Sequence, residues 1–141
     1  DKSVSALRAA AMLSHAYAEA TTVKISVVTG KACGAVFACV ASKSAQADLV
    51  LALDTALISV IDPEAAALTL MSDRREKGES LEALAKEYER ENCSPDLAAA
   101  DGFIDDVVTI SELRGKLISA LDMLSGKRVS GLDKKHSNMP L

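Results

Sequence analysis

The chain contains few aromatic residues and no tryptophan. Two Tyr and two Phe give an aromatic content of 3%, whereas hydrophobic residues as a whole make up 49% of the 141 residues. A core built from this sequence must rely on Ala, Val, Leu and Ile. At this length we expect one domain that buries roughly 70% of the surface of its unfolded chain.

The sequence also lacks the features of several protein classes. No apolar run reaches the ~18–20 residues that span a membrane, and no charged and apolar leader opens the chain, so we expect a cytoplasmic protein. The formal net charge of −4, with no basic patch interleaved with aromatics, argues against nucleic acid as a partner. Cys33, Cys39 and Cys93 form no CxxC pair, so we expect neither a disulfide framework nor a metal site.

Helical and extended patterns alternate along the chain. Helical spacing predicts helices over residues 3–20, 63–71, 81–92, 95–101 and 111–124, and small residues predict a short helix over 32–42. Compact apolar or β-branched runs predict strands over residues 23–29, 48–53, 57–61 and 103–110. This alternation predicts an α/β domain with a short sheet covered by helices.

Polar residues mark the starts of the predicted helices. Asp62 followed by Pro63 is a typical N-cap signal, and so is Ser80. We expect Ser111 to cap the last helix. Gly115 inside that helix costs on the order of 1 kcal/mol relative to Ala, so we expect a neighbour to approach closely there.

The most informative stretch is TGKACGA, residues 29–35, at the end of a predicted strand. Gly30 and Gly34 favour a tight turn from strand into helix. Backbone N–H groups that follow such a turn have no helical partner and lie at the positive end of the helix dipole. They are suited to stabilise an oxygen on which negative charge develops. The stretch matches neither GxGxxG nor GxxxxGK[ST], and a purely structural turn is the alternative interpretation.

Side chains elsewhere offer little acid or base chemistry. No histidine lies near Cys33 in the sequence, so we expect an inert, packed thiol. Asp105 and Asp106 are adjacent on a predicted strand and therefore point to opposite faces. We expect His15 to lie on a helix surface, and Glu87, Glu89 and Glu91 to form a solvated helix face.

Three longer stretches carry a more specific signal: KISVVTGKACGA at residues 24–35, GFIDDVV at 102–108, and KKHSNMPL at 134–141. Together they resemble the C-terminal, biotin-facing half of the carboxyltransferase (beta) subunit of biotin-dependent acyl-CoA carboxylases and decarboxylases. That group includes propionyl-CoA carboxylase, methylmalonyl-CoA carboxyltransferase and glutaconyl-CoA decarboxylase. The resemblance implies a crotonase-like fold, a superhelix of strand–turn–helix units, over residues 1–126, and a basic tail over 127–141.

The resemblance also implies a reaction: carboxyl transfer between biotin on a carrier protein and an acyl-CoA, with no metal. In the family, backbone amides after the first glycine of the turn point at the ureido oxygen of biotin. Carried over to this sequence, Gly34 makes the turn, and the amides of Ala35 and Val36 form the oxyanion hole. Phe37 and Ala38 complete the expected biotin contact. The implied partners are the acyl-CoA, the biotin carboxyl carrier protein, an N-terminal carboxyltransferase half and further copies in an oligomer.

The sequence departs from the family pattern at this turn. Family members usually read KAYGGAY, whereas here Ala35 replaces the second glycine and Val36 replaces the alanine that follows it. Asp62 stands where the family has a glycine, which places a charge beside the turn. Two alternatives therefore stay open. One is a free-standing crotonase-like enzyme that acts on CoA thioesters, and the other is a catalytically degenerate structural half.

Overall fold

The computed structural model describes residues 2–129, so the KKHSNMPL ending with His136 lies outside the described residues. The helices are α1 (Lys2–Glu19), α2 (Ala35–Cys39), the 3₁₀ helix η1 (Lys43–Ala45), α3 (Pro63–Thr69), α4 (Ser72–Glu76), α5 (Leu81–Asn92), α6 (Pro95–Ala100) and α7 (Ile110–Leu124). The strands are β1 (Ile25–Val28), β2 (Lys31–Cys33), β3 (Leu49–Leu53), β4 (Leu57–Ser59) and β5 (Asp106–Val108).

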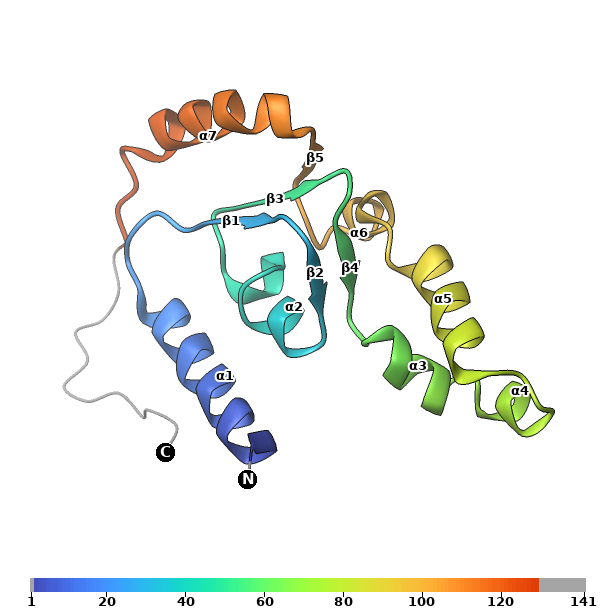
Figure 1. The fold of residues 1–141 in the computed structure, drawn as a ribbon. Helices are drawn as coiled ribbons and strands as arrows, with labels where there is room; N and C mark the ends of the chain where they lie inside the picture. Colours follow the sequence, from blue (N-terminus) through green and yellow to red (C-terminus); the bar gives the residue numbers. More distant parts are fainter. Residues whose placement is uncertain (1, 130–141) are drawn as a thin grey trace.

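The strands form two small parallel sheets instead of the single sheet expected (Figure 1). In the first sheet the order is β1, β3, β5, with Ile25 opposite Leu49, and in the second β2 pairs with β4, with Lys31 opposite Leu57. Two successive units each run strand, corner, strand, helix: β1–β2–α2 and β3–β4–α3. The first strand of each unit joins one sheet and the second strand joins the other. This repeat builds a superhelix of strand–turn–helix units, and the α/β class is confirmed.

The helix predicted over residues 32–42 is only partly correct. Lys31–Cys33 forms β2, and α2 covers only Ala35–Cys39. The strand is three residues long and contains small residues that carry no strand signal of their own. It exists because it pairs with β4, which lies far along the chain. Local sequence patterns could not show that pairing.

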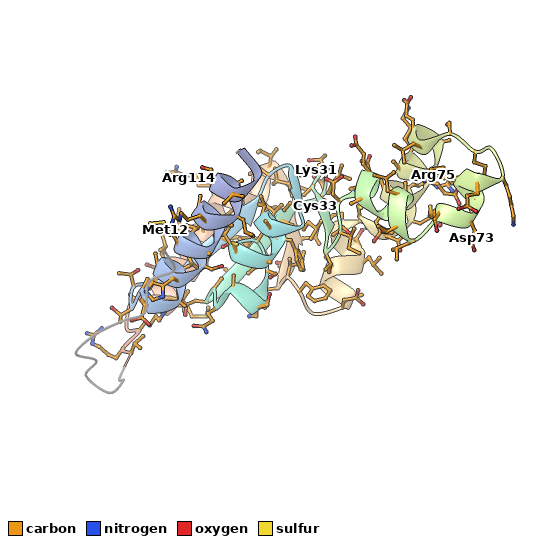
Figure 2. All side chains as sticks on the ribbon, turned by 90° about the horizontal axis from the view of Figure 1, so that it is seen from below. Met12, Lys31, Cys33, Asp73, Arg75 and Arg114 are labelled. Carbon is orange, nitrogen blue, oxygen red and sulfur yellow. The ribbon has the colours of Figure 1, made fainter. Side chains whose placement is uncertain are left out.

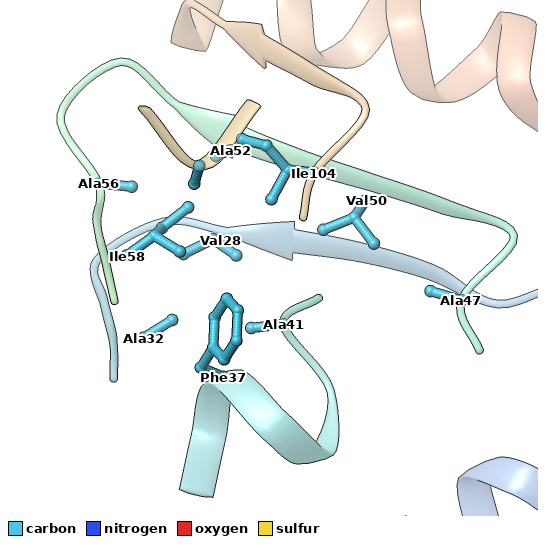
Figure 3. Packing of buried hydrophobic residues seen from close by; sticks show 11 residues of the cluster. Val28, Ala32, Phe37, Ala41, Ala47, Val50, Ala52, Ala56, Ile58 and Ile104 are labelled. Carbon is cyan, nitrogen blue, oxygen red and sulfur yellow. The ribbon is translucent and has the colours of Figure 1, made fainter. Parts of the chain in front are cut away.

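Alanine fills much of the main core. Figure 3 shows the ring of Phe37 pointing from α2 towards the strands, where Val28, Val50 and Ile58 supply the larger aliphatic groups. Six alanines occupy the remaining space: Ala32, Ala41, Ala47, Ala52, Ala56 and Ala98. Because these side chains are small, the strands of both sheets and α2 approach one another closely. The core expected from the composition is confirmed.

Helix α7 covers the first sheet on the side away from α2 (Figure 1). Leu113 and Leu117 pack against Leu51, Leu53 and Val108 of β3 and β5. The other side of α7 carries four exposed apolar residues: Ile110 (73% exposed), Ile118 (51%), Leu121 (54%) and Met123 (72%). In the described chain, α7 therefore buries only one of its apolar faces.

The N-cap of α7 is Thr109, so the expected cap at Ser111 is wrong. Thr109 and Glu112 form a capping box, in which the Thr109 amide donates to Glu112 Oε2 at 3.1 Å. The T-x-x-E spacing of Thr109 and Glu112 is typical of a capping box, and it predicts the N-cap better than the presence of Ser111, which lies inside the first turn. The predicted caps Asp62 and Ser80 are confirmed, because each side chain accepts from a backbone amide of its helix.

Helices α3, α4 and α5 form an arm on one side of the molecule (Figure 1). Leu84 of α5 is fully buried and packs against Ala67 of α3. Arg74 of α4 donates to Glu79 at 2.7 Å and to Glu87 at 2.7 Å. Glu87 keeps 31% of its side chain exposed on the outer face of α5, and its ion pair with Arg74 also holds α4 against α5.

We predict that Gly115→Ala raises the free energy of unfolding by about 0.5–1 kcal/mol, because Ala is the better helix former. Within the described residues nothing lies within 4 Å of a Cβ placed at Gly115, so the close neighbour expected there is not found. Urea unfolding followed by circular dichroism measures the effect. Gly102→Ala is the matched control, and it should destabilise because Gly102 has φ +76°. A destabilising Gly115→Ala would contradict the prediction.

Candidate functional site

The candidate site is the turn between β2 and α2, and Gly34 shapes it. Gly34 has φ 59° and ψ −121°, a backbone conformation that L side chains rarely adopt. Its amide donates to the carbonyl of Ser59, at the end of β4, over 3.3 Å. A Cβ at Gly34 would meet nothing within 4 Å, so the turn requires glycine for its backbone conformation and not for space.

The first two amides after Gly34, those of Ala35 and Val36, differ from the amides further along α2. The later amides are paired within the helix: Ala38 donates to the Gly34 carbonyl at 3.0 Å, and Val40 donates to the Val36 carbonyl at 3.2 Å. In the part of the chain that the structure describes, no carbonyl or side chain accepts a hydrogen bond from the amides of Ala35 and Val36. Both residues are exposed. The structure thus brings together the two amides singled out from the sequence and leaves them available to a ligand.

The other two predicted contact residues lie differently. Phe37 is only 5% exposed, and its ring makes an edge-to-face contact with Phe103 at a centroid distance of 5.2 Å. The Phe37 ring therefore belongs to the core and holds α2 against the strands. Ala38 is exposed and presents only a methyl group. Ala35, Val36 and Ala38 form the solvent-facing part of the predicted contact set.

Two hollows border α2. The first, which we call the β1 hollow, has a volume of about 390 Å³ and runs along the edge of β1. It is lined by Ser26, Val27, Val28, Thr29, Gly30, Lys31, Ala32, Val36, Val40 and Ala41. The second has a volume of about 190 Å³ and lies among α2, β4, α5 and α6, where Phe37, Ser59, Tyr88 and Asn92 contribute to its wall. Val36, whose amide is one of the two donors, is among the residues that line the β1 hollow.

An ion pair lies beside the turn. Lys31 Nζ is 2.9 Å from Asp62 Oδ2, and about half of each side chain is exposed. The hydrogen bond from Lys31, helped by the amide of Glu64, lowers the pKa of Asp62, and the same hydrogen bond raises the pKa of Lys31. Figure 2 shows Lys31 close to Cys33 in the middle of the molecule, between α1 and the α4 end of the arm. The pair links the start of β2 to the cap of α3.

Apart from the Lys31–Asp62 pair, the titratable side chains considered from the sequence do not form a shared acid–base site among the described residues. Burial raises the pKa of the Cys33 thiol, which agrees with an inert cysteine. Asp105 pairs with Lys43 and Asp106 pairs with Lys116, so the two aspartates serve separate ion pairs as expected. Between residues 2 and 129, no group of three or more His, Cys, Asp or Glu could hold a metal ion. Within that span there is also no helix with the length and apolarity to cross a membrane.

Two contacts of the site were missed by sequence reasoning. The hydrogen bond from Gly34 to the Ser59 carbonyl and the Lys31–Asp62 pair both join residues from successive units of the superhelix. Neither has a signal in the local sequence, because each depends on the β2–β4 pairing. The charge of Asp62 beside the turn was noted, but its partner was not.

Comparison with known proteins places the chain in context. It is 41% identical over 139 residues to the carboxyltransferase subunit of propionyl-CoA carboxylase from Haloferax mediterranei, which covers 96% of this chain and 27% of that subunit. It is 36% identical over 139 residues to the methylmalonyl-CoA decarboxylase alpha subunit of Propionigenium modestum, again covering 96% and 27%. The chain therefore spans about a quarter of the length of the curated relatives that it matches.

Solved structures support the same relationship. The chain superposes on transcarboxylase 12S, crystallised as a hexamer with hydrolysed methylmalonyl-coenzyme A, with a TM-score of 0.81 and 34% identity, covering 96% of this chain and 26% of that chain. The beta subunit of the geranyl-CoA carboxylase of P. aeruginosa shares the fold, with a TM-score of 0.61 at 19% identity, covering 86% and 25%. These are crotonase-like carboxyltransferases. The family model for the carboxyl transferase domain matches residues 3–139, and this chain therefore belongs to the carboxyl transferase domain family.

Proposed function

We propose that this chain forms the biotin-facing half-site of an acyl-CoA carboxyltransferase, with the amides of Ala35 and Val36 donating to the ureido oxygen of biotin. The observation that carries the proposal is that the amides of two exposed residues after Gly34, in a chain of this family, have no hydrogen-bond acceptor among the described residues. Biotin on a carrier protein would supply the carboxyl group. Preorganised amides that face developing negative charge are a strong source of transition-state stabilisation.

The surroundings of these amides suit a compact, mostly uncharged ring. The residues that line the β1 hollow beside Val36 are small or aliphatic apart from Lys31, whose ammonium group is paired with Asp62. The role of this chain's residues is then to bind and orient. Gly34 sets the direction of the amides, and the Phe37 ring holds α2 on the core. Carboxylation removes a proton from the α-carbon of the acyl-CoA, and the ureido nitrogen of biotin would accept that proton once its carboxyl group has left, so this role requires no side-chain base at the turn.

The half-site requires a partner surface. β1 and β2 each lie at the edge of their sheet, where backbone groups can pair with another chain. Helix α7 exposes several large apolar residues on one face, which is unusual for a surface that contacts only water. We infer that the rest of the carboxyltransferase subunit covers these surfaces, with an N-terminal half that holds the acyl-CoA and with further copies in an oligomer. The relatives support this inference, since this chain corresponds to only about a quarter of their length. The biotin carboxyl carrier protein would be the partner that delivers biotin.

The test is an NMR titration of the isotope-labelled chain with a biotinylated lysine peptide, with a CoA thioester as the parallel ligand. We expect saturable shifts at the amides of Ala35 and Val36 with the biotin peptide. Shifts with the CoA thioester alone would favour a free-standing crotonase-like enzyme. If both ligands leave the amides unchanged, the titration is repeated with the remainder of the subunit added. Continued silence there would identify a degenerate structural half.

Gly34→Ala should weaken the response of these amides to the biotin peptide at least tenfold, because a residue with a Cβ at φ 59° is strained by roughly 1–3 kcal/mol and the turn must rearrange. The same titration measures the effect. Gly115→Ala is the matched control, since it makes the same change on a distant helix and should leave the response intact. Equal responses in wild type and Gly34→Ala would contradict the role assigned to the turn.

A further inference from the structure

A groove follows one side of helix α5. One hollow of about 410 Å³ lies between α3 and α5, and a second of about 330 Å³ lies where α5 meets the turn between β3 and β4 and the start of α6. Lys86 and Glu89 of α5 line both hollows, which we call together the α5 groove. Because α5 has 12 residues, the groove accompanies roughly 18 Å of helix, and this length suits a second helix as its occupant.

The α5 groove combines apolar surface with acidic side chains. Pro63, Leu81 and Ala85 contribute apolar surface between α3 and α5. Three acidic residues line the groove and form no ion pair among the described residues: Asp54, Glu64 and Glu89. They are spread over both hollows, so the acidic character extends along the whole groove.

The basic residues that line the groove already have acidic partners. These ion pairs are Lys31–Asp62 at 2.9 Å, Lys86–Glu82 at 2.8 Å and Arg90–Glu91 at 3.1 Å. Glu89 lies close enough to Lys31 for its charge to act on the ammonium group, but no ion pair joins the two. Acidic groups are therefore in excess, and the groove favours a partner that is both apolar and positively charged.

The exposed side of helix α1 is a surface of that kind. Val4 is 64% exposed and Leu7 is 73% exposed, and a spacing of three residues makes them neighbours on the helix. Arg8 is exposed beside them and forms no ion pair among the described residues. Between residues 2 and 18 the sequence contains Lys2 and Arg8 and neither Asp nor Glu. Helix α1 is thus complementary to the α5 groove in both charge and apolar surface.

The groove of one chain is not within reach of its own α1. The Cys39 thiol donates to the Ala10 carbonyl at 3.5 Å, and the Tyr17 hydroxyl lies 2.9 Å from Ser26 Oγ, so another side of α1 is held on the domain. Helix α1 and the arm that contains α5 lie at opposite sides of the molecule in both views (Figures 1 and 2). A second copy of the chain is needed to bring an α1 to the groove.

We propose that copies of this chain associate head to tail, with the exposed side of α1 of one copy lying in the α5 groove of the next. Val4 and Leu7 cover the apolar surface, and Arg8 faces the acidic residues that have no ion pair. Because the contact joins two different surfaces, each copy can bind a further copy, and the assembly forms a ring or an open chain. The inference deepens the oligomer of the proposed function, since it names the surfaces that join the copies.

The test is sedimentation velocity of the 141-residue chain over a range of concentrations. We expect the mass to rise with concentration and the association to weaken as NaCl is added. Arg8→Glu and Glu89→Lys should each weaken the association at least tenfold, because each places like charges together. An equimolar mixture of the two variants should recover it, because the unaltered α1 of one variant meets the unaltered groove of the other.

Matched variants show whether these surfaces are responsible. Glu76→Lys makes the same charge reversal on α4, at an exposed residue outside the groove, and should change the association by less than about twofold. Asp54→Lys alters the groove at an exposed turn and should act like Glu89→Lys. Leu7→Gln should weaken the association without any change of charge, whereas Leu121→Gln on α7 should not. Circular dichroism verifies that each variant is folded.

Several results would overturn the proposal. They are a wild-type chain that stays monomeric, a mixture that does not recover the association, an effect of Glu76→Lys equal to that of Glu89→Lys, or a dependence on Leu121 and not on Leu7. None of them involves the biotin peptide. Failure of the proposed function is recognised separately, from the amide shifts of Ala35 and Val36.

Discussion

Phe37→Ala is expected to lower the free energy of unfolding by about 3–5 kcal/mol, the largest effect of any single substitution predicted for this chain. Phe37 is the only aromatic residue among the fully buried members of the main core cluster, and it is 5% exposed. Its neighbours are mostly alanines and short aliphatic residues, which have little side chain with which to fill a cavity. The contact with Phe103 would also be lost. Urea unfolding of both proteins, analysed with a common slope, measures the difference.

The neighbouring residue provides the control for this prediction. Val36→Ala truncates an exposed side chain, 52% accessible, one position away on the same helix, and should change stability by less than about 0.5 kcal/mol. Phe37→Leu refills most of the space and should fall between the two. If Phe37→Ala cost no more than Val36→Ala, the ring would not be the anchor that holds α2 and its amides on the sheets.

Asp48→Ala is expected to cost about 2–4 kcal/mol, because it leaves a largely buried lysine without its counter-charge. Asp48 Oδ2 accepts from the Lys24 amide at 2.7 Å and from Lys127 Nζ at 2.8 Å. Lys127 also donates to the Thr22 carbonyl at 2.9 Å. The side chains of Lys127 and Asp48 are only 18% and 19% exposed. This cluster fastens the chain that follows α7 to the segment between α1 and β1, so the first residue assigned to the basic tail is attached to the domain.

The pH dependence of stability distinguishes the charge of Asp48 from its packing. Burial alone would raise the pKa of Asp48, but hydrogen bonds from Lys127 and from the Lys24 amide outweigh it and lower that pKa. The stabilisation is therefore complete above the ordinary Asp pKa of about 3.9, and it is lost as the pH falls through the lower native value. Asp48→Asn should remove this acid-dependent part. Unfolding curves between neutral pH and about pH 3 measure it, and a variant profile parallel to wild type would contradict the assignment.

The matched control for Asp48 is an exposed ion pair. Glu82 and Lys86 lie four residues apart on α5 with side chains 80% and 74% exposed. Glu82→Gln should change stability by less than about 0.5 kcal/mol, because exposed pairs are screened and cost side-chain entropy. A loss as large as that of Asp48→Ala would show that burial is not what makes the Asp48 cluster important.

Several features of the fold were readable from the sequence because their causes are local. The periodicities of residues 3–20 and 81–92 predicted α1 and α5, and the caps Asp62 and Ser80 marked the starts of α3 and α5. The alternation of elements predicted the α/β class. The resemblance predicted the family and the crotonase-like fold, and both are confirmed. The amides of Ala35 and Val36 were chosen in the same way, and their assignment to biotin stays a prediction.

Other features required the tertiary structure because residues distant in the chain create them. β2 exists through its pairing with β4, which also brings Gly34 to Ser59 and Lys31 to Asp62. The resemblance marked Phe37 as a contact residue, but packing in an alanine-rich core placed its ring inside. The sequence by itself determined the longer helices and the turn that carries free amides, since backbone geometry and capping act over a few positions. Only the tertiary structure decided which charges and rings surround that turn, because long-range strand pairing brings those groups together.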